Sequence, residues 1–198
     1  MTITADQVKQ LRELTGAGMM ECKKALSESG GDVEKAIDAL RKAGIAKAEK
    51  RSERAVSEGL VEAYIHPGNR VGVLIEVNCE TDFVARTPEF AALVRDLAMQ
   101  AAAAGADYVR RDEVPAARIE REREIYAAQL VQQGKPAAMI DKIVTGKLDR
   151  FYSEVCLLEQ PFIKDDKQTV QGLVQAASAK TGENIVVRRF ARFRLGQE

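Results

Sequence analysis

The chain has 198 residues, of which 45% are hydrophobic and 30% are charged, and its 30 basic residues balance its 30 acidic ones. This composition is that of a globular protein with one large or two modest domains. The zero formal net charge argues against binding of nucleic acid by general phosphate neutralisation, although it leaves room for local basic patches.

No apolar run approaches the roughly 18–20 residues of a membrane span, and the N-terminus lacks the basic-then-apolar pattern of a signal peptide. The three cysteines, Cys22, Cys79 and Cys156, are far apart and form no CxxC motif. Reduced thiols in the cytosol are the simplest interpretation of that spacing. We therefore expect a cytoplasmic protein that makes no membrane contact.

Residues 1–45 predict three short amphipathic helices joined by glycine turns. The first helix begins after a threonine cap and ends at the Gly-rich turn of residues 15–18. The second is expected over about residues 19–29, and the third from the Asp32 cap to near Gly44. Such a bundle resembles ubiquitin-associated domains and is too small to contain a catalytic cleft. Docking to another protein is therefore favoured over a purely scaffolding role.

Apolar side chains of this bundle are expected both in its core and on its surface. Val8, Leu11 and Leu14 of the first helix follow the spacing of a buried stripe. Met19 and Met20 come directly after the Gly-rich turn. We expect one of these methionines in the core and the other on the surface, where a flexible thioether suits an adaptable contact.

A mixed-charge stretch, residues 46–57, predicts a solvated and partly helical linker to a second domain. That domain opens with a β-hairpin, in which residues 60–66 and 71–79 form the strands on either side of a Pro-Gly-Asn turn. One face of the second strand carries its apolar side chains, which are Val71, Val73, Ile75, Val77 and Cys79. This alternation is typical of a half-buried strand.

The second strand runs into Thr81, Asp82, Phe83 and Val84, where the chain must turn. A large aromatic ring at the tip of a rigid strand either packs locally or enters a partner, because an exposed ring costs solubility. On these residues alone, local packing of Phe83 is the favoured interpretation.

The residues after the hairpin predict mostly helices. Thr87 and Pro88 are a strong helix start, since Thr suits the cap and Pro the first helical position. A helical pair is expected over about residues 115–133 and 136–158, and the glycine of the second helix, Gly146, predicts a break within it.

A short helix over about residues 169–179 precedes a final strand over residues 185–195. The predicted fold class is therefore α+β. It comprises the N-terminal three-helix bundle, the linker and, over residues 58–198, a core of a small antiparallel sheet covered by helices.

Motifs for catalysis and metal binding are absent from the sequence. Residues 145–148 lack the first glycine and the final hydroxyl of a phosphate-binding loop, and GxGxxG, HExxH and GxSxG do not occur. His66 is the only histidine and abuts the hairpin turn, which favours a structural role over metal ligation. Scattered carboxylates leave a hydrolase open, but nothing singles out a pair. We expect a non-enzyme that works by contacts, with no cofactor and no bound metal.

Three segments of the chain resemble bacterial translation elongation factor Ts, in its short form. They are LRELTGAGMMECKKAL at residues 11–26, EVNCETDFVA at 76–85 and EQPF at 159–162. The first two motifs are long and specific, and the similarity covers nearly the whole chain. The resemblance implies a guanine nucleotide exchange factor for elongation factor Tu, the GTPase that delivers aminoacyl-tRNA during peptide chain elongation.

The resemblance also implies roles for particular residues. It implies that the bundle docks on the GTPase domain of elongation factor Tu, with Arg12, Met19 and Met20 as contacts. It implies further that the segment Thr81–Val84 disturbs the Mg²⁺ site of this partner. A role of this kind requires the ring of Phe83 to enter the partner instead of packing locally.

Longer members of the family carry a second, related half-core that this chain is too short to include. One sheet edge or apolar face should then be left uncovered, and a second copy of the chain can complete it. By analogy with the short members of the family, we expect a homodimer that forms a two-to-two complex with elongation factor Tu. No direct contact with nucleic acid is expected.

Two other interpretations of the sequence stay open. An adaptor of ubiquitin-associated type explains the bundle but neither of the other two motifs. An RNA-binding protein would use the arginines of the last strand and would show steep salt dependence. These arginines are Arg188, Arg189, Arg192 and Arg194. Neutral overall charge and the lack of interleaved surface aromatics favour an exposed strand instead.

Overall fold

The computed structural model describes residues 3–197, apart from the side chains of residues 45 and 47–49. The expected domain limits at residues 1 and 198 lie outside the described residues, and the division into 1–45, 46–57 and 58–198 stays a prediction. The chain forms two compact units. The first comprises the residues up to Leu60, Val77–Leu93 and Gly172–Val186, and the second comprises Val61–Glu76, Val94–Gln171 and the residues from Val187 onward.

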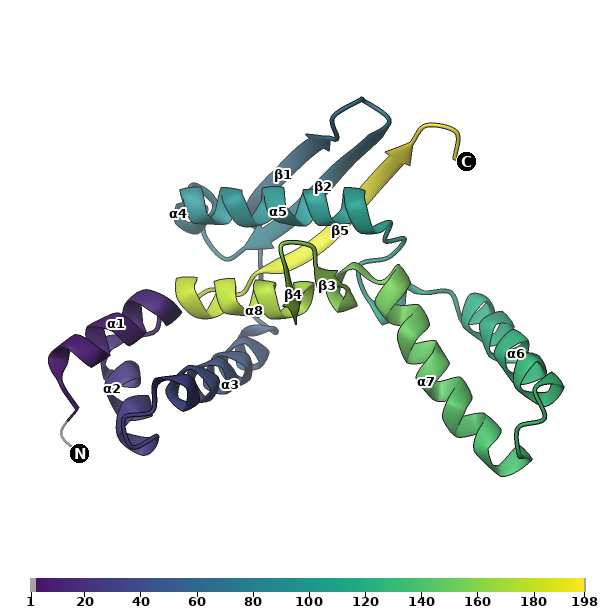
Figure 1. The fold of residues 1–198 in the computed structure, drawn as a ribbon. Helices are drawn as coiled ribbons and strands as arrows, with labels where there is room; N and C mark the ends of the chain where they lie inside the picture. Colours follow the sequence, from purple (N-terminus) through teal and green to yellow (C-terminus); the bar gives the residue numbers. More distant parts are fainter. Residues whose placement is uncertain (1–2, 198) are drawn as a thin grey trace. The chain divides into compact units, whose positions relative to one another are not determined.

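The first unit begins with the predicted bundle of α1 (Ala5–Thr15), α2 (Met19–Glu28) and α3 (Val33–Arg51) (Figure 1). A capping box starts α1, because the Thr4 hydroxyl accepts a hydrogen bond from the Gln7 N–H and the Gln7 side chain accepts one from the Thr4 N–H. The buried side chains between the helices are Val8, Leu11, Cys22, Ala25, Leu26 and Ala36.

The expectation that the third helix ends near Gly44 is wrong, because α3 continues to Arg51. The Cβ that alanine would place at position 44 lies 3.3 Å from the Cβ of Ala179 in α8 (Val170–Thr181). The glycine therefore permits a close helix contact and does not end the helix. Arg51 adds a hydrogen bond from its Nη1 to the Ser178 carbonyl at 3.2 Å. In the first unit, α3 thus packs on α8.

A three-stranded antiparallel sheet contains β1 (Glu58–Ile65), β2 (Val71–Cys79) and β5 (Val186–Arg194), in the order β1-β2-β5. The predicted hairpin is therefore present, and Asn69 takes a left-handed conformation (φ 55°) in its turn. The residues of β2 that are buried alternate along the strand and are Val73, Ile75, Val77 and Cys79. This alternation confirms the half-buried strand. The antiparallel sheet, together with the helices before and after it, confirms the α+β fold class.

Two helices follow β2, namely α4 (Asp82–Ala85) and α5 (Pro88–Ala104). The Thr87 hydroxyl accepts from the Phe90 N–H at 3.2 Å, which confirms the predicted cap of α5. Gly105 takes a left-handed conformation (φ 67°) directly after the helix. The buried stripe of α5 consists of Phe90, Leu93, Val94, Leu97, Ala98 and Ala101.

The second unit contains a helical hairpin of α6 (Ala116–Gln132) and α7 (Ala137–Val155) (Figure 1). Leu130, Val144 and Leu148 are buried between the two helices. The predicted break at Gly146 is wrong, since α7 is continuous through this residue. A glycine inside a helix costs only about 1 kcal/mol relative to alanine. The buried side chains on either side of Gly146 stabilise the helix by more than that.

Short elements complete the second unit. They are η1 (Arg111–Glu113), η2 (Leu157–Glu159), β3 (Pro161–Phe162) and β4 (Asp165–Thr169), and β3 pairs antiparallel with β4. Gln160 is buried and donates to the carbonyl of Glu154 at 2.9 Å, and it accepts from the Gln100 amide at 3.1 Å. Among residues 3–197, none of the helices combines the length and apolar character that a bilayer crossing requires.

Cys156, directly after α7, has no exposed surface and packs with Val114 and Phe151. Burial raises the pKa of the Cys156 thiol from its ordinary value of 9.0 to about 11, with a smaller contribution from the nearby Glu159 carboxylate. The thiol is therefore held in its neutral form more firmly in the folded than in the unfolded chain.

We expect the free energy of unfolding to fall as the pH rises from 9.0 to about 11, because the Cys156 thiol of the unfolded chain ionises first. One such group changes the free energy by at most about 1.4 kcal/mol per pH unit. Urea unfolding at stepped alkaline pH should show a shallower decline for Cys156→Ala than for the wild type. Equal slopes would contradict the raised pKa.

Candidate functional site

The residues Thr81–Val84, here called the tip segment, leave β2 through a single helical turn. Thr81 has an extended backbone (φ −128°, ψ 154°), and its Oγ1 accepts from the Val84 N–H at 3.4 Å, so that it caps α4. Ala85 ends the turn and is buried, which anchors the turn to the fold.

Phe83 directs its ring into solvent. It is 81% exposed, whereas Phe90, seven residues later, is only 2% exposed. The expectation from the residues alone that Phe83 packs locally is therefore wrong. Residues two apart in a helix point about 200° apart, so a turn anchored through Ala85 turns Phe83 outward.

Asp82 pairs with Arg86 at the surface, with 3.0 Å between Oδ2 and Nη2. Both side chains are well exposed, so this pair stabilises the turn by only about 0.3–0.5 kcal/mol. In the described part of the chain, no three His, Cys, Asp or Glu side chains are arranged to hold a metal ion. Asp82 is thus an exposed carboxylate whose ion pair is with Arg86 of the same turn.

Cys79, the last residue of β2, supports the tip segment from the interior. Its thiol donates a hydrogen bond to the Thr81 carbonyl at 3.2 Å. Burial, with a further contribution from the Glu183 carboxylate, raises the pKa of the Cys79 thiol. At neutral pH the thiol therefore keeps the proton that this hydrogen bond needs.

The turn between α1 and α2 is held by several hydrogen bonds. Gly16 takes a left-handed conformation (φ 67°), and its N–H donates to the Arg12 carbonyl at 2.8 Å. The Thr15 hydroxyl donates to the Leu11 carbonyl at 2.7 Å and lies 3.9 Å from the buried Cys22 sulfur. A secured turn of this kind fixes where the first residues of α2 emerge.

Arg12, Met19 and Met20 are all exposed beside this turn, Met19 by 47% and Met20 by 75%. The expectation that one methionine enters the core is wrong. Cys22 and Leu26 of α2 have no exposed surface and fill that space. Both thioethers are therefore available to a partner.

Leu14 was expected in the buried stripe but is 70% exposed. Each step of three residues along a helix rotates the side chain by about 60° in one sense. Leu14 is two such steps from Val8 and leaves the buried face, whereas Thr15 stays close to it. Leu14 is thus a further exposed side chain before this turn. The four exposed residues that flank the turn, Arg12, Leu14, Met19 and Met20, are called the bundle patch below.

Sequence reasoning also missed the residues that hold the tip segment, Glu80 and Glu183. The Glu183 carboxylate accepts hydrogen bonds from the backbone N–H groups of Glu80 and Thr81, at 3.0 and 3.1 Å. One signal was available in the sequence. Glu183 lies three residues before β5, the strand that pairs with β2, which brings it near the end of β2.

The fold and the exposed side chains together define a class of protein. An α+β protein that exposes apolar side chains at a helical turn and at a strand tip is typical of proteins that act by binding other proteins. Comparison with known proteins identifies the family. The family model "Elongation factor TS" matches residues 3–197.

Relatives named elongation factor Ts are similar along nearly their whole length. The relative from Heliobacterium modesticaldum is 58% identical over 195 residues, which are 98% of this chain and 91% of the relative. The relative from Geobacter sulfurreducens is 56% identical over 197 residues (100% and 91%), and that from Moorella thermoacetica is 58% identical over 195 residues (98% and 96%). The chain belongs to the elongation factor Ts family and is a translation elongation factor.

Replacement of Phe83 by alanine should leave the free energy of unfolding unchanged within about 0.5 kcal/mol, because the ring is exposed. The matched variant Phe90→Ala should lose about 3–5 kcal/mol, because that ring is buried. Urea denaturation followed by circular dichroism measures both. A loss above about 1 kcal/mol for Phe83→Ala, roughly twice the expected limit, would mean that the ring packs on its own chain.

Proposed function

We propose that this protein is a guanine nucleotide exchange factor for elongation factor Tu, which promotes release of GDP so that GTP can bind. The observation that carries the proposal is the exposed Phe83 ring at the end of a strand buried on one face. A rigid strand brings the ring to a partner in one orientation, so little conformational entropy is lost on binding. Membership of the elongation factor Ts family supports this choice of partner.

In the proposed mechanism the tip segment acts as a wedge. A GTPase holds GDP largely through its phosphate loop and through a Mg²⁺ ion that bridges to phosphate oxygens. Phe83 enters the partner beside this site and displaces the elements that line it. Asp82 offers a carboxylate to a donor of the partner, while Thr81 and Val84 set the turn that carries the ring. The partner then holds both Mg²⁺ and GDP more weakly.

Linkage determines what this mechanism requires. If the factor weakens nucleotide binding, the nucleotide weakens binding of the factor by the same free energy. The factor must therefore bind the emptied partner more tightly than the occupied one, because equal affinity shifts nothing. Excess of GTP over GDP then sets the direction of exchange. No covalent bond is made or broken, so the protein acts without being an enzyme.

The bundle patch is the proposed docking surface for the GTPase domain of the partner. Its two methionines and Leu14 offer apolar area, and the Arg12 guanidinium offers donors for a carboxylate. Docking through this surface holds the tip segment close to the nucleotide site. We place this work in the cytoplasm, with no direct contact to nucleic acid.

Release of a fluorescent GDP from purified elongation factor Tu tests the function. The wild-type protein should accelerate release at micromolar concentration, and Phe83→Ala should lose most of the acceleration. A desolvated aromatic anchor of this kind contributes about 2–4 kcal/mol, or roughly 30-fold or more in rate. Ile125→Ala, which shortens an exposed side chain of α6, is the matched control and should behave as the wild type. Absence of acceleration by the wild type would reject the proposal.

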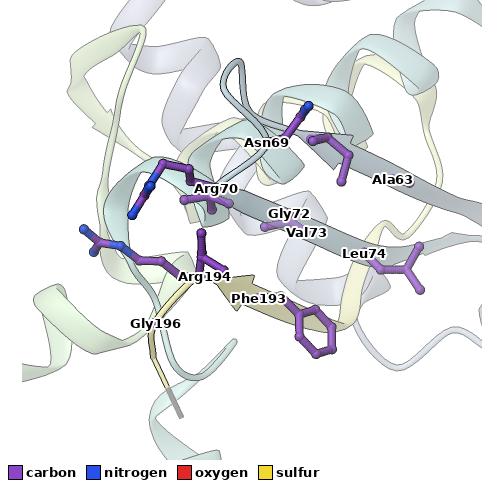
Figure 2. Close-up of a pocket in the computed structure, with 12 residues that line it drawn as sticks. Ala63, Asn69, Arg70, Gly72, Val73, Leu74, Phe193, Arg194 and Gly196 are labelled. Atoms are coloured by element: carbon purple, nitrogen blue, oxygen red, sulfur yellow. The ribbon is translucent and has the colours of Figure 1, made fainter.

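One face of the three-stranded sheet leaves large apolar side chains uncovered. In the second unit, Leu74 of β2 is 50% exposed between the buried Val73 and Ile75. The exposed apolar residues of β1, β2 and the end of β5, here called the open sheet face, are Val61, Ile65, Leu74, Phe193 and Leu195. Figure 2 shows Leu74 and Phe193 projecting from neighbouring strands. Contiguous exposed apolar surface of this kind marks an interaction site.

The open sheet face is shallow and carries charges of both signs. The Ile65 side chain lies across Gly72, whose missing Cβ leaves room for it, and a surface depression there is lined by Ile65, Gly72 and Phe193. Arg189 pairs with Glu76 on the neighbouring strand at 2.8 Å. Paired opposite charges and a zero net charge of the chain favour contact with an identical surface.

We propose that a second copy of the chain covers the open sheet face, giving a homodimer and a two-to-two complex with elongation factor Tu. Two such faces packed together form a sandwich of two sheets with an apolar interior. Each copy then keeps its own tip segment and bundle patch, since neither surface contributes residues to the open sheet face.

Light scattering should give a mass near twice the 21.7 kDa of one chain. Phe193→Asp should lower the mass to that of one chain, because an unpaired carboxylate in an apolar interface is strongly unfavourable. Phe83→Asp is the control, since it places the same charge at a ring of similar exposure outside the open sheet face and should stay dimeric. A wild-type mass of one chain at micromolar concentration would reject the homodimer.

A further inference from the structure

The tip segment is held by a carboxylate from another part of the first unit. Glu183 follows α8, and its Oε2 accepts from the backbone N–H groups of Glu80 and Thr81 at 3.0 and 3.1 Å. Its Oε1 accepts from the Thr81 hydroxyl at 2.5 Å. All three hydrogen bonds of this carboxylate therefore end on the two residues that lead into α4.

The contact is reciprocal. The Glu80 carboxylate accepts from the backbone N–H of Asn184 at 2.6 Å and from the Arg54 guanidinium at 3.3 Å. Asn184 is only 5% exposed, and its side-chain amide donates to the carbonyls of Ser52 and Arg54 at 3.3 and 3.0 Å. Each glutamate thus binds the backbone beside the other, and the pair is joined to the chain that follows α3.

Thr81 connects the Glu183 carboxylate to the helical turn that carries the Phe83 ring. Its hydroxyl donates to Glu183 and accepts from the Val84 N–H, so both of its hydrogen-bonding directions are used. The helical turn that it caps has only four residues, too few to be stable without outside contacts. Hydrogen bonds to a carboxylate are stronger than those between neutral groups. Glu183 therefore fixes the direction in which Phe83 leaves the fold.

We propose that Glu183 is a positioning residue for nucleotide exchange, which acts through Thr81 to hold the Phe83 ring in the orientation that enters the partner. This inference rests on the proposed function. Without the Glu183 carboxylate, the turn samples several orientations. Insertion of the ring into the partner then has to order the turn, which costs conformational entropy. The loss should therefore appear in the rate of GDP release at saturation. Docking through the bundle patch should be unaffected.

Glu183→Gln is the most direct test. Glutamine keeps the length of the side chain but removes its negative charge and one acceptor oxygen. Its NH2 group must then face either the backbone N–H donors of Glu80 and Thr81 or the Thr81 hydroxyl, which donates to the wild-type carboxylate. We expect the saturating rate of GDP release to fall at least tenfold, while the half-saturating concentration changes less than twofold. Glu89→Gln, at an exposed position in the first turn of α5, is the matched control and should equal the wild type.

A second measurement does not involve the partner. Amide hydrogen exchange at Phe83 and Val84 should become at least tenfold faster in Glu183→Gln, while the amides of the bundle core keep their wild-type rates. If Glu183→Gln is too unstable to purify, Glu183→Asp shortens the side chain by one methylene and keeps its charge. It should show the same two changes with smaller size.

The outcomes separate this inference from the proposed function. Unchanged exchange of the Phe83 and Val84 amides in Glu183→Gln would overturn the positioning role. An unchanged rate of GDP release with Glu183→Gln would also overturn it, provided that Phe83→Ala is defective in the same assay. If Phe83→Ala releases GDP as fast as the wild type, the proposed function fails and the inference falls with it. Faster amide exchange together with a lowered saturating rate supports the positioning role.

Discussion

Hydrophobic burial along one face of β2 is the constraint on which the candidate site depends. Val73, Ile75 and Val77 are at most 3% exposed, so the strand has no freedom to shift its register without exposing all of them. The position of the residues that follow β2 and lead into α4 is therefore fixed by the strand. The capped turn of α4 then needs to define only a few dihedral angles to direct the Phe83 ring.

Hydrogen bonds fix the conformation of the turn that follows the buried strand. The Cys79 thiol holds the Thr81 carbonyl, and the Glu183 carboxylate holds the Thr81 N–H and hydroxyl. Satisfying these groups leaves the turn with one favoured conformation, because an unpaired polar group near the core is costly. An exposed aromatic ring can then be kept ready for a partner without a packing contact of its own, at a cost in solubility that the rest of the surface offsets.

Elements with strong periodicity and clear caps could be predicted from the sequence. The Thr4 capping box, the hairpin of β1 and β2 and the Thr87 cap of α5 are examples. Glycines misled the prediction at Gly44 and Gly146, because a glycine that ends a helix and one that permits packing or is merely tolerated look the same in sequence. The exposure of Leu14 followed from a rotation of the helix that a simple spacing rule ignores.

The candidate site was partly accessible to sequence reasoning. Its motif was visible, but the support from Glu183 depends on a contact across 102 residues of chain, which no local pattern encodes. The surroundings of α8 show a consequence of that contact. This helix meets α3 at Ala179, and Glu183, two residues after the end of the helix, accepts the hydrogen bond of the Thr81 hydroxyl. Within the first unit, α8 therefore connects α3 to the turn that carries Phe83, and a rigid α8 fixes the spacing between them.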